Sequence, residues 1–251
     1  MSDRLLFITT LTRLLEGRRH VFVGGGSAAA ATASLLQRAL SGDRLQITML
    51  GDKRYLFLSN DYSEIFNCAA TGRYDAFFMG GGQIDGGGNV NLIGIGDHPT
   101  LKVRWPGSRG TPLIYMMIEN TILFLEEHTR RVLVPRVDYI SAPGTSEPGV
   151  YHPGGPVALV TPRCVFSFDR KRARFTLETL NPGHSLEEVN EHTGFDFDVA
   201  PNLGETPGPG LPLLELLRDR VLDELSVIYP QYTETLRNEV DAAIAAQRQA
   251  A

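Results

Sequence analysis

The stretch that decides the fold is His20-Val21-Phe22-Val23-Gly24-Gly25-Gly26-Ser27, which leads into an alanine-rich segment that ends at Leu40. An apolar tetrapeptide directly before glycines is typical of a buried strand. Leu35, Leu36 and Leu40 recur at helical spacing, so the sequence predicts a helix over 27–40. Strand, glycine turn and helix form the first half of a parallel βα unit, which indicates an α/β fold.

The same alternation continues along the chain. Helices are predicted over 62–71 and 113–120, and strands over 45–50, 76–79, 90–95, 121–125, 137–140, 157–160, 164–168 and 174–180. Short apolar strands that alternate with helices are typical of parallel sheets covered on both faces. We therefore expect an open, mainly parallel sheet with helices on both of its faces.

No internal repeat and no strong boundary divides the chain, so we expect a single domain over 1–251. Segment 142–156 holds four prolines and four glycines, which predicts a long loop. Residues 202–212 are predicted to form a Gly/Pro linker before a terminal helix. The polar Ala/Gln tail is expected to fray from about residue 240.

Composition excludes several classes of protein. Lys plus Arg number 24 against 29 Asp plus Glu, which gives a net charge of −5 and argues against nucleic acid as a partner. No apolar run approaches the roughly 18 residues that span a bilayer. The N-terminus lacks the pattern of a secretion signal, so we expect a cytoplasmic protein. Cys68 and Cys164 have no metal-ligand spacing, and no metal site is predicted.

The 26 glycines are clumped, and three clumps follow or precede predicted elements. Unpaired amides at such turns face anions well, so we predict a ligand site lined by main chain. A tight turn packed against its neighbours is an equally good interpretation. The spacing is not GxGxxG, which leaves a nicotinamide site as the least favoured option. The candidate binding residues are Gly24, Gly25, Gly26, Ser27, Gly80, Gly81, Gly82, Gln83, Gly107, Ser108, Arg109 and Gly110.

An ordered series of motifs resembles the β-subunit of glutaconate CoA-transferase and its family I relatives. It includes Gly-Gly-Gly-Gln-Ile-Asp at 80–85, Gly-Asn-Val-Asn at 88–91 and Lys-Val-Arg-Trp-Pro-Gly-Ser-Arg-Gly at 102–110. It continues through 137–144, 154–156, 180–184 and 187–197. The resemblance implies the fold shared by CoA transferases and ribose-5-phosphate isomerase. It also implies an α-subunit partner, in a heterodimer or heterotetramer, and coenzyme A as part of the substrate with no tightly bound cofactor.

In transferases of this family a β-subunit glutamate attacks the thioester. That glutamate is expected just after strand 45–50, yet no Glu occurs between Glu16 and Glu64, and Asp52 is the nearby acid. Asp52 is therefore the candidate catalytic residue, with a side chain one methylene shorter. The resemblance also covers relatives that have lost the glutamate, such as a steroid-ring-opening CoA hydrolase and a glutaconyl-CoA-type decarboxylase.

The expected function is a β-like subunit that acts on an acyl-CoA by hydrolysis, C–C cleavage or decarboxylation. The alternatives are genuine CoA transfer to a carboxylic acid, with Asp52 or a partner residue in place of the glutamate, and a non-catalytic scaffold or ligand-sensing subunit. Arg109 stands where the family pattern has glycine, and an Arg there suits a substrate carboxylate or a CoA phosphate.

Overall fold

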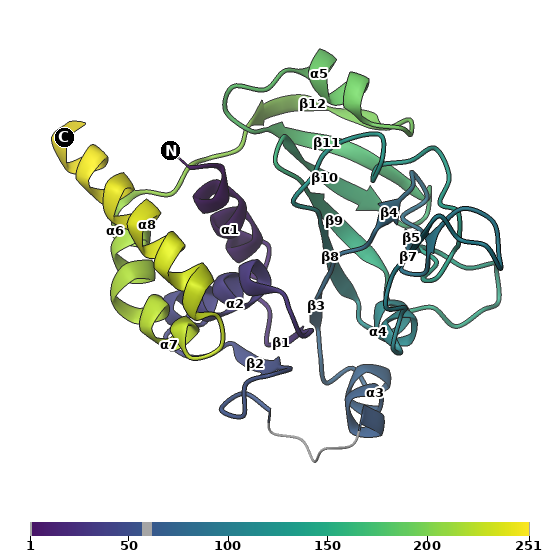
Figure 1. The fold of residues 1–251 in the computed structure, drawn as a ribbon, viewed down its shortest axis with the longest axis horizontal. Helices are drawn as coiled ribbons and strands as arrows, with labels where there is room; N and C mark the ends of the chain where they lie inside the picture. The colour runs from purple at the N-terminus through teal and green to yellow at the C-terminus, as the bar shows by residue number, and fades with distance from the viewer. Residues whose placement is uncertain (1, 57–61, 251) are drawn as a thin grey trace. The chain divides into compact units, whose positions relative to one another are not determined.

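The computed structural model describes residues 2–56 and 62–250 (Figure 1). Contacts within the chain form two compact units. The first comprises Met1–Ser59 with Pro207–Ala251, and the second comprises Asn60–Thr206. The single domain expected over 1–251 stays a prediction, and the two units are described separately below.

The first unit combines two parallel strands with helices from both ends of the chain. Strand β1 (His20–Val23) pairs in parallel with β2 (Gln46–Met49), so that Val21 lies opposite Ile47. Helix α2 (Ala28–Leu40) connects them and buries its alanines with Leu35 and Leu36, as its spacing predicts. The other elements are α1 (Asp3–Arg13), α6 (Leu211–Leu216), the π-helical turn η1 (Leu217–Val221), α7 (Leu222–Ser226) and α8 (Pro230–Ala250).

Helix α8 covers the segment for which a polar tail is predicted. Leu236, Val240 and Ile244 recur every four residues and are buried, so one apolar stripe of α8 packs against α6 and α7. Pro230 begins the helix, where its missing N–H leaves no hydrogen bond unmade. The tail is therefore helical to Ala250, and fraying of its end stays a prediction.

The strands of the second unit lie in the order β12-β11-β10-β9-β8-β3. Neighbours β3 (Ala76–Met79), β8 (Asn120–Phe124) and β9 (Pro156–Val160) are parallel. Strand β10 (Cys164–Asp169) is antiparallel to β9 and β11 (Arg174–Leu180), and β12 (Asp198–Glu205) is parallel to β11. The helices are α3 (Tyr62–Ala70), α4 (Thr111–Met117) and α5 (Leu186–His192). An α/β fold with mainly parallel pairing is confirmed.

The core of the second unit is aromatic at the antiparallel end of its sheet. The Phe166 and Phe175 rings meet edge to face with centroids 6.0 Å apart, and Phe195 stacks on Phe175 at 5.5 Å. Phe166 and Phe175 are fully buried, which fixes β10 and β11 beneath the segment that follows α5.

The strand predicted over 137–140 is wrong, because the Val137 and Asp138 amides donate to the side chains of Asp85 and Gln83 and not to a neighbouring strand.

The strand predicted over 90–95 is also wrong. Strand β5 (Val90–Asn91) pairs with β4 (Gln83–Ile84), and β6 (Gly94–Ile95) forms a separate hairpin with β7 (Val103–Arg104). The Asn91 side chain causes the break, because its Oδ1 accepts from the amides of Ile93 (2.9 Å) and Gly94 (3.4 Å). Such local bonds draw the backbone out of a strand and into a turn.

The linker predicted over 202–212 is wrong in its first part, since β12 extends to Glu205. Pro201 and Gly204 disfavour a central strand but are tolerated at the edge of a sheet, where β12 lies. The Arg174 guanidinium fixes β12 to β11 through Asp198 at 2.6 Å. The loop predicted over 142–156 has no helix or strand until β9 begins at Pro156.

Candidate functional site

The first glycine turn, Gly24–Ser27, joins β1 to α2 in the first unit. The amides of Gly26 and Ser27 form hydrogen bonds to the Tyr229 phenol, and these bonds oppose the rise in its pKa that burial causes. The amides that the sequence predicts to face an anion therefore meet a tyrosine oxygen of this chain. Gly24 differs from its neighbours, because a Cβ built there meets nothing within 4 Å and its φ is not positive. Its role as a binding residue stays a prediction.

The second turn, Gly80–Gln83, follows β3, and packing within the second unit explains its residue types. A Cβ on Gly81 would lie 2.3 Å from Val90 Cγ1, and one on Gly82 would lie 2.1 Å from the Trp105 ring. The Gln83 side chain is buried, and its Oε1 accepts from the Asn91 side chain at 2.8 Å and from the Asp138 amide at 3.0 Å. Close internal approach is sufficient reason for these glycines.

The third turn, Gly107–Gly110, leads into α4. A Cβ on Gly110 would lie 2.4 Å from the Phe66 ring, whereas one on Gly107 would meet nothing within 4 Å. Arg109 is exposed and holds a left-handed backbone with φ of +43°. A non-glycine residue in that region costs about 1 kcal/mol or more, and such strain gathers at functional sites.

Trp105 brings the second and third turns together, because its ring lies on Gly82 and it precedes Gly107 by two residues. The first turn and Asp52 share the other unit, where a Cβ on Gly25 would lie 3.9 Å from Leu50 Cβ. The predicted residues thus form two local groups, one in each unit.

Asp52 follows β2 at the predicted place, but its carboxylate forms an ion pair with an arginine, Arg54. The Arg54 guanidinium donates to both carboxylate oxygens, with Nη2 at 2.5 Å from Oδ2, and the Arg54 amide donates to Oδ1 at 2.9 Å. The Asp52 side chain is 4% exposed. The bond to Arg54 lowers the pKa of Asp52, so the group is a charge-paired carboxylate with little free lone-pair capacity.

The same ion pair fastens the C-terminal helices to the loop after β2. Arg54 Nη2 also donates to the Glu224 carbonyl at 2.8 Å. The Tyr55 hydroxyl donates to the Glu224 carboxylate and accepts from the Arg38 guanidinium at 2.8 Å. Asp52, Arg54, Tyr55 and Glu224 therefore form a structural clamp within the first unit.

Replacing Asp52 by asparagine is expected to lower the free energy of unfolding by about 1–2 kcal/mol, because charge-assisted bonds to Arg54 become neutral ones. Turnover of an acyl-CoA thioester should stay within about threefold, whereas removal of a nucleophile costs about a thousandfold or more. Urea denaturation and steady-state kinetics measure the two effects. Asp43→Asn, at an exposed ion pair with Arg38, is the control for loss of one charge. A thousandfold loss in Asp52→Asn alone would contradict the structural role.

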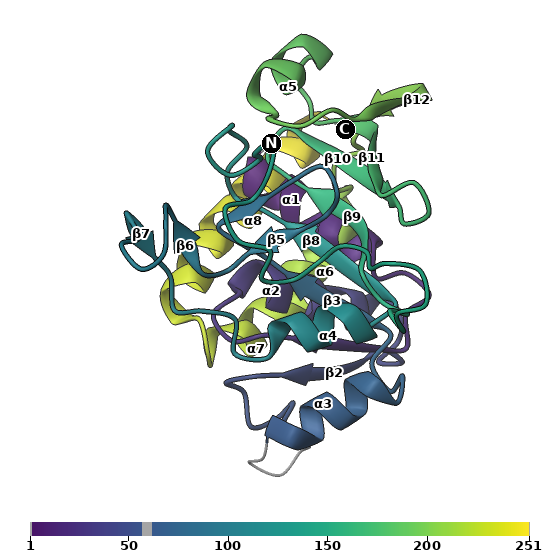
Figure 2. The same ribbon diagram turned by 90° about the vertical axis from the view of Figure 1, so that its right-hand side faces the viewer.

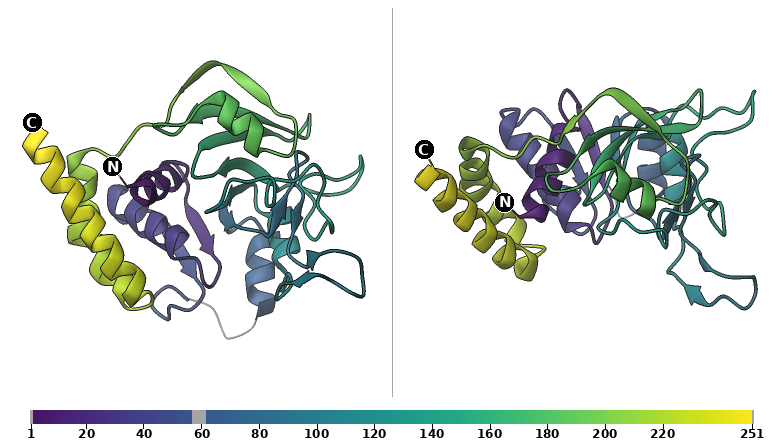
Figure 3. Two further views of the ribbon diagram at one scale, coloured as in Figure 1. Left: turned by 45° about the horizontal axis from the view of Figure 1, so that its top comes forward. Right: turned by 90° about the horizontal axis from the view of Figure 1, so that it is seen from above.

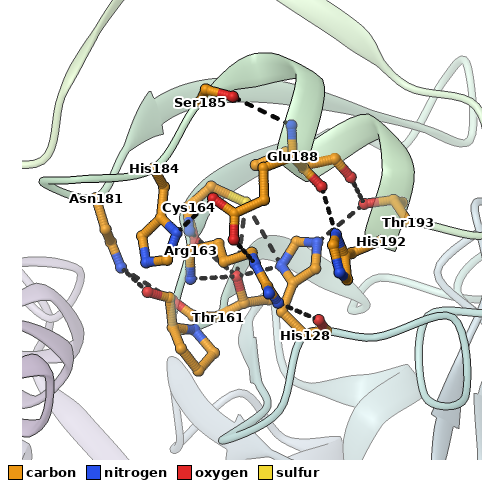
Figure 4. A network of polar contacts seen from close by, with 12 residues as sticks. His128, Thr161, Arg163, Cys164, Asn181, His184, Ser185, Glu188, His192 and Thr193 are labelled. Atoms are coloured by element: carbon orange, nitrogen blue, oxygen red, sulfur yellow. Dashed lines mark hydrogen bonds and ion pairs between the residues drawn. The ribbon is translucent and has the colours of Figure 1, made fainter.

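A cysteine and a histidine 36 residues apart meet inside the second unit (Figure 4). His128 Nδ1 lies 2.8 Å from Thr161 Oγ1 and 3.9 Å from Cys164 Sγ, and Nε2 lies 3.0 Å from Thr193 Oγ1. Thr193 donates its own proton to the Val189 carbonyl at 2.7 Å, which assigns the ring proton to Nε2. Burial lowers the pKa of His128 to about 4 and raises that of Cys164 to about 12. A neutral ring beside a protonated thiol is not an activated nucleophile.

An ion-pair layer surrounds this buried ring (Figure 4). The Arg163 guanidinium donates to Glu188 at 2.7 Å and also to the His128 carbonyl. Together with His184, whose Nδ1 lies 2.8 Å from the same carboxylate, Arg163 lowers the pKa of Glu188 to about 2. No sequence motif signals this network, since its members come from three separate segments, at residue 128, at 161–164 and at 184–193.

Two cavities in the second unit lie away from the predicted turns. One of about 840 Å³ is lined by the loop residues 144–150 together with Arg170 and Lys171, and one of about 420 Å³ lies beside Asp85 and Arg174. Within residues 2–56 and 62–250, no group of three or more His, Cys, Asp or Glu side chains is placed to hold a metal ion. In the same part of the chain, no helix combines the length and apolarity required to cross a membrane.

Comparisons with known proteins agree with the motifs. A model described as Coenzyme A transferase matches residues 51–192. The B subunit of 3-oxoadipate CoA-transferase from Pseudomonas knackmussii is 35% identical over 59% of this chain and 58% of its own length. The B subunit of glutaconate CoA-transferase from Acidaminococcus fermentans is 37% identical over 57% of this chain and 56% of its own length. The chain thus spans little more than half the length of these curated relatives.

Two further likenesses concern other reactions. The cholesterol ring-cleaving hydrolase IpdB subunit of Rhodococcus jostii is 30% identical over 66% of both chains. A crystal structure of the decarboxylase AibA/AibB superposes with a TM-score of 0.75 over 86% of this chain and 93% of that one, at 23% identity. The structural likeness concerns the fold alone.

Proposed function

Because the chain belongs to the coenzyme A transferase family, we propose that it is the β-type subunit of a two-subunit enzyme that acts on an acyl-CoA thioester. The proposed reaction is hydrolysis, C–C cleavage or decarboxylation. Relatives named as B subunits support a partner of the α type, and the ring-cleaving hydrolase relative supports chemistry other than transfer. Coenzyme A enters as part of the substrate.

The preference for chemistry other than CoA transfer rests on one observation, the ion pairing of Asp52, the acid that follows β2. Covalent transfer requires a free carboxylate that attacks the thioester carbonyl. This chain has no glutamate from residue 17 to residue 63, and its Asp52 carboxylate accepts three hydrogen bonds from one guanidinium. An acid held in this way is a poor nucleophile, because attack would break the ion pair.

The proposed site keeps the requirements of thioester chemistry that do not depend on that acid. A developing oxyanion needs amide donors fixed before the reaction. In the second unit the turns at Gly80–Gln83 and Gly107–Gly110 are the candidates. In the first unit Gly24 and Gly25 remain candidates, because the amides of Gly26 and Ser27 bond the Tyr229 phenol. Arg109 is the candidate for an anionic group of the substrate, since its guanidinium is exposed and its backbone is constrained.

The experiment co-expresses this chain with an A-type subunit of the family and supplies a panel of acyl-CoA thioesters, with and without an acceptor carboxylic acid. Conversion of a thioester without any acceptor supports the proposal, whether it appears as free CoA (hydrolysis), as CO2 (decarboxylation) or as a cleaved acyl group that keeps its CoA (C–C cleavage). Strict dependence on the acceptor, together with exchange of labelled CoA and a CoA adduct on this chain by mass spectrometry, supports transfer and overturns it. Tight CoA binding with no turnover of any thioester supports the scaffold or ligand-sensing alternative.

A further inference from the structure

The β6–β7 hairpin extends away from the rest of the second unit (Figures 2 and 3). The start of its connecting loop is held, because the Gly96 amide donates to Asp138 at 2.9 Å and the Tyr139 hydroxyl donates to the Gly96 carbonyl at 2.5 Å. Both residues of β7, Val103 and Arg104, are exposed. A strand that is exposed on both faces contributes little to the core, so its residue types need another reason.

The two faces of the hairpin differ in character. Ile95 lies opposite Val103 on one face. On the other face Arg104 lies opposite Gly94, and a Cβ on Gly96 would lie 3.3 Å from Lys102 Cγ. Lys102 and Arg104 are two residues apart, so they share a side of the strand, about 7 Å apart along it. Glycines face both cations, and the side chains of Lys102 and Arg104 are exposed.

In the part of the chain that the structure describes, Lys102, Arg104 and Arg109 form no ion pair, although the chain carries a net charge of −5. By contrast, Arg163, Arg172 and Arg174 of the same unit are paired with acids. The three cations outnumber the two carboxylates at the hairpin, Asp97 and Asp138, so the local field is positive and attracts an anion.

We propose that the basic face of the β6–β7 hairpin binds the phosphate groups at the nucleotide end of the CoA thioester. Exposed glycine backbone allows a phosphate to approach closely, and Lys102 and Arg104 supply the charge-assisted hydrogen bonds that phosphate oxygens accept. Two cations about 7 Å apart suit a ligand with several phosphates better than a single carboxylate. The inference rests on the proposed action on acyl-CoA.

The fluorescence of Trp105 can report binding at the hairpin, because Trp105 is the only tryptophan of the chain and directly follows Arg104. Fluorescence of the full chain is followed during titration with CoA, with S-acetylpantetheine, which lacks phosphate, and with inorganic pyrophosphate. We expect CoA to change the emission in a salt-sensitive manner and S-acetylpantetheine to have no effect. The double variant Lys102→Gln/Arg104→Gln should bind CoA about tenfold or more weakly, since two charge-assisted contacts are lost.

The matched control is Arg73→Gln/Lys171→Gln, which removes two exposed cations of the same unit outside the hairpin. An equal loss in control and hairpin variants, or unchanged CoA binding in the hairpin variant, would overturn the proposal. Pyrophosphate that competes as well as CoA would assign a general anion site and also overturn it. Saturable binding of an acidic protein surface, with no response to CoA, would assign the hairpin to subunit contact instead. Binding is measured without turnover, so a transferase result in the acceptor assay leaves this test intact.

Discussion

Lowering the pH from 7.5 to 4.5 is expected to remove about 2–3 kcal/mol of unfolding free energy through one buried side chain, His128. Its pKa is about 4 in the folded chain, against an ordinary value of 6.5, and burial is the main cause. The unfolded chain therefore takes up a proton that the folded chain refuses. This stability is complete above pH 6.5 and is lost as the pH falls from there toward 4.

Urea denaturation at several pH values measures the effect. His128→Gln should be less stable at pH 7.5 but should show a flatter dependence between pH 6.5 and 4.5. His152→Gln is the matched control, because burial and Arg170 also lower the pKa of His152 but this side chain is less buried. Glu188 has a pKa of about 2, so the stability that its ionised carboxylate contributes is lost mainly below pH 4.5, outside the pH range measured. An unchanged slope in His128→Gln would refute the assignment.

Replacing Gly144 by alanine is expected to destabilise the chain by about 3 kcal/mol, the upper end of the usual cost of overpacking. A Cβ there would lie 2.3 Å from the Gly87 carbonyl oxygen and 2.8 Å from that of Gly88. Backbone atoms cannot turn aside as a side chain can, so the loop that begins at Ala142 must shift. Thermal and urea unfolding both report the loss.

Gly24→Ala is the matched control, since a Cβ at Gly24 meets open space. Its stability should be unchanged or slightly higher, because alanine reduces the entropy of the unfolded chain. If Gly24 faces a bound thioester, as the sequence predicts, the same variant should raise KM without loss of stability. Equal destabilisation in Gly144→Ala and Gly24→Ala would contradict the packing geometry.

The expected site and the observed geometry differ most in what the glycines do. The clumps suggested a site lined by main chain. In the structure, however, the Trp105 ring packs against Gly82, 23 residues earlier in the chain, and the Phe66 ring packs against Gly110. Close packing with a distant side chain leaves the same trace in a sequence as close approach of a ligand. Gly24, Gly26 and Gly107 are the glycines of the predicted set at which a Cβ would meet no atom within 4 Å.

The amino-acid sequence alone determined the local elements and the family. Apolar runs before glycines and helical spacing of leucines place β1, α2 and β3, because these signals arise from residues next to one another. The ordered motifs from 80 to 197 predicted a resemblance that the family match confirms. The absence of a glutamate after β2 is also a fact of the sequence.

Only the tertiary structure decided which residues meet. Asp52 is linked through Arg54 to Glu224, and His128 lies between Thr161 and Thr193. Strand β12 pairs with β11, and Arg104 lies opposite Gly94. Each of these contacts joins residues whose separation in the sequence follows neither a helical or strand period nor the spacing of a known motif. These contacts are stabilised by burial and hydrogen bonding that arise only once distant segments have come together. The sequence specifies the contacts, but no local pattern of residues reveals them.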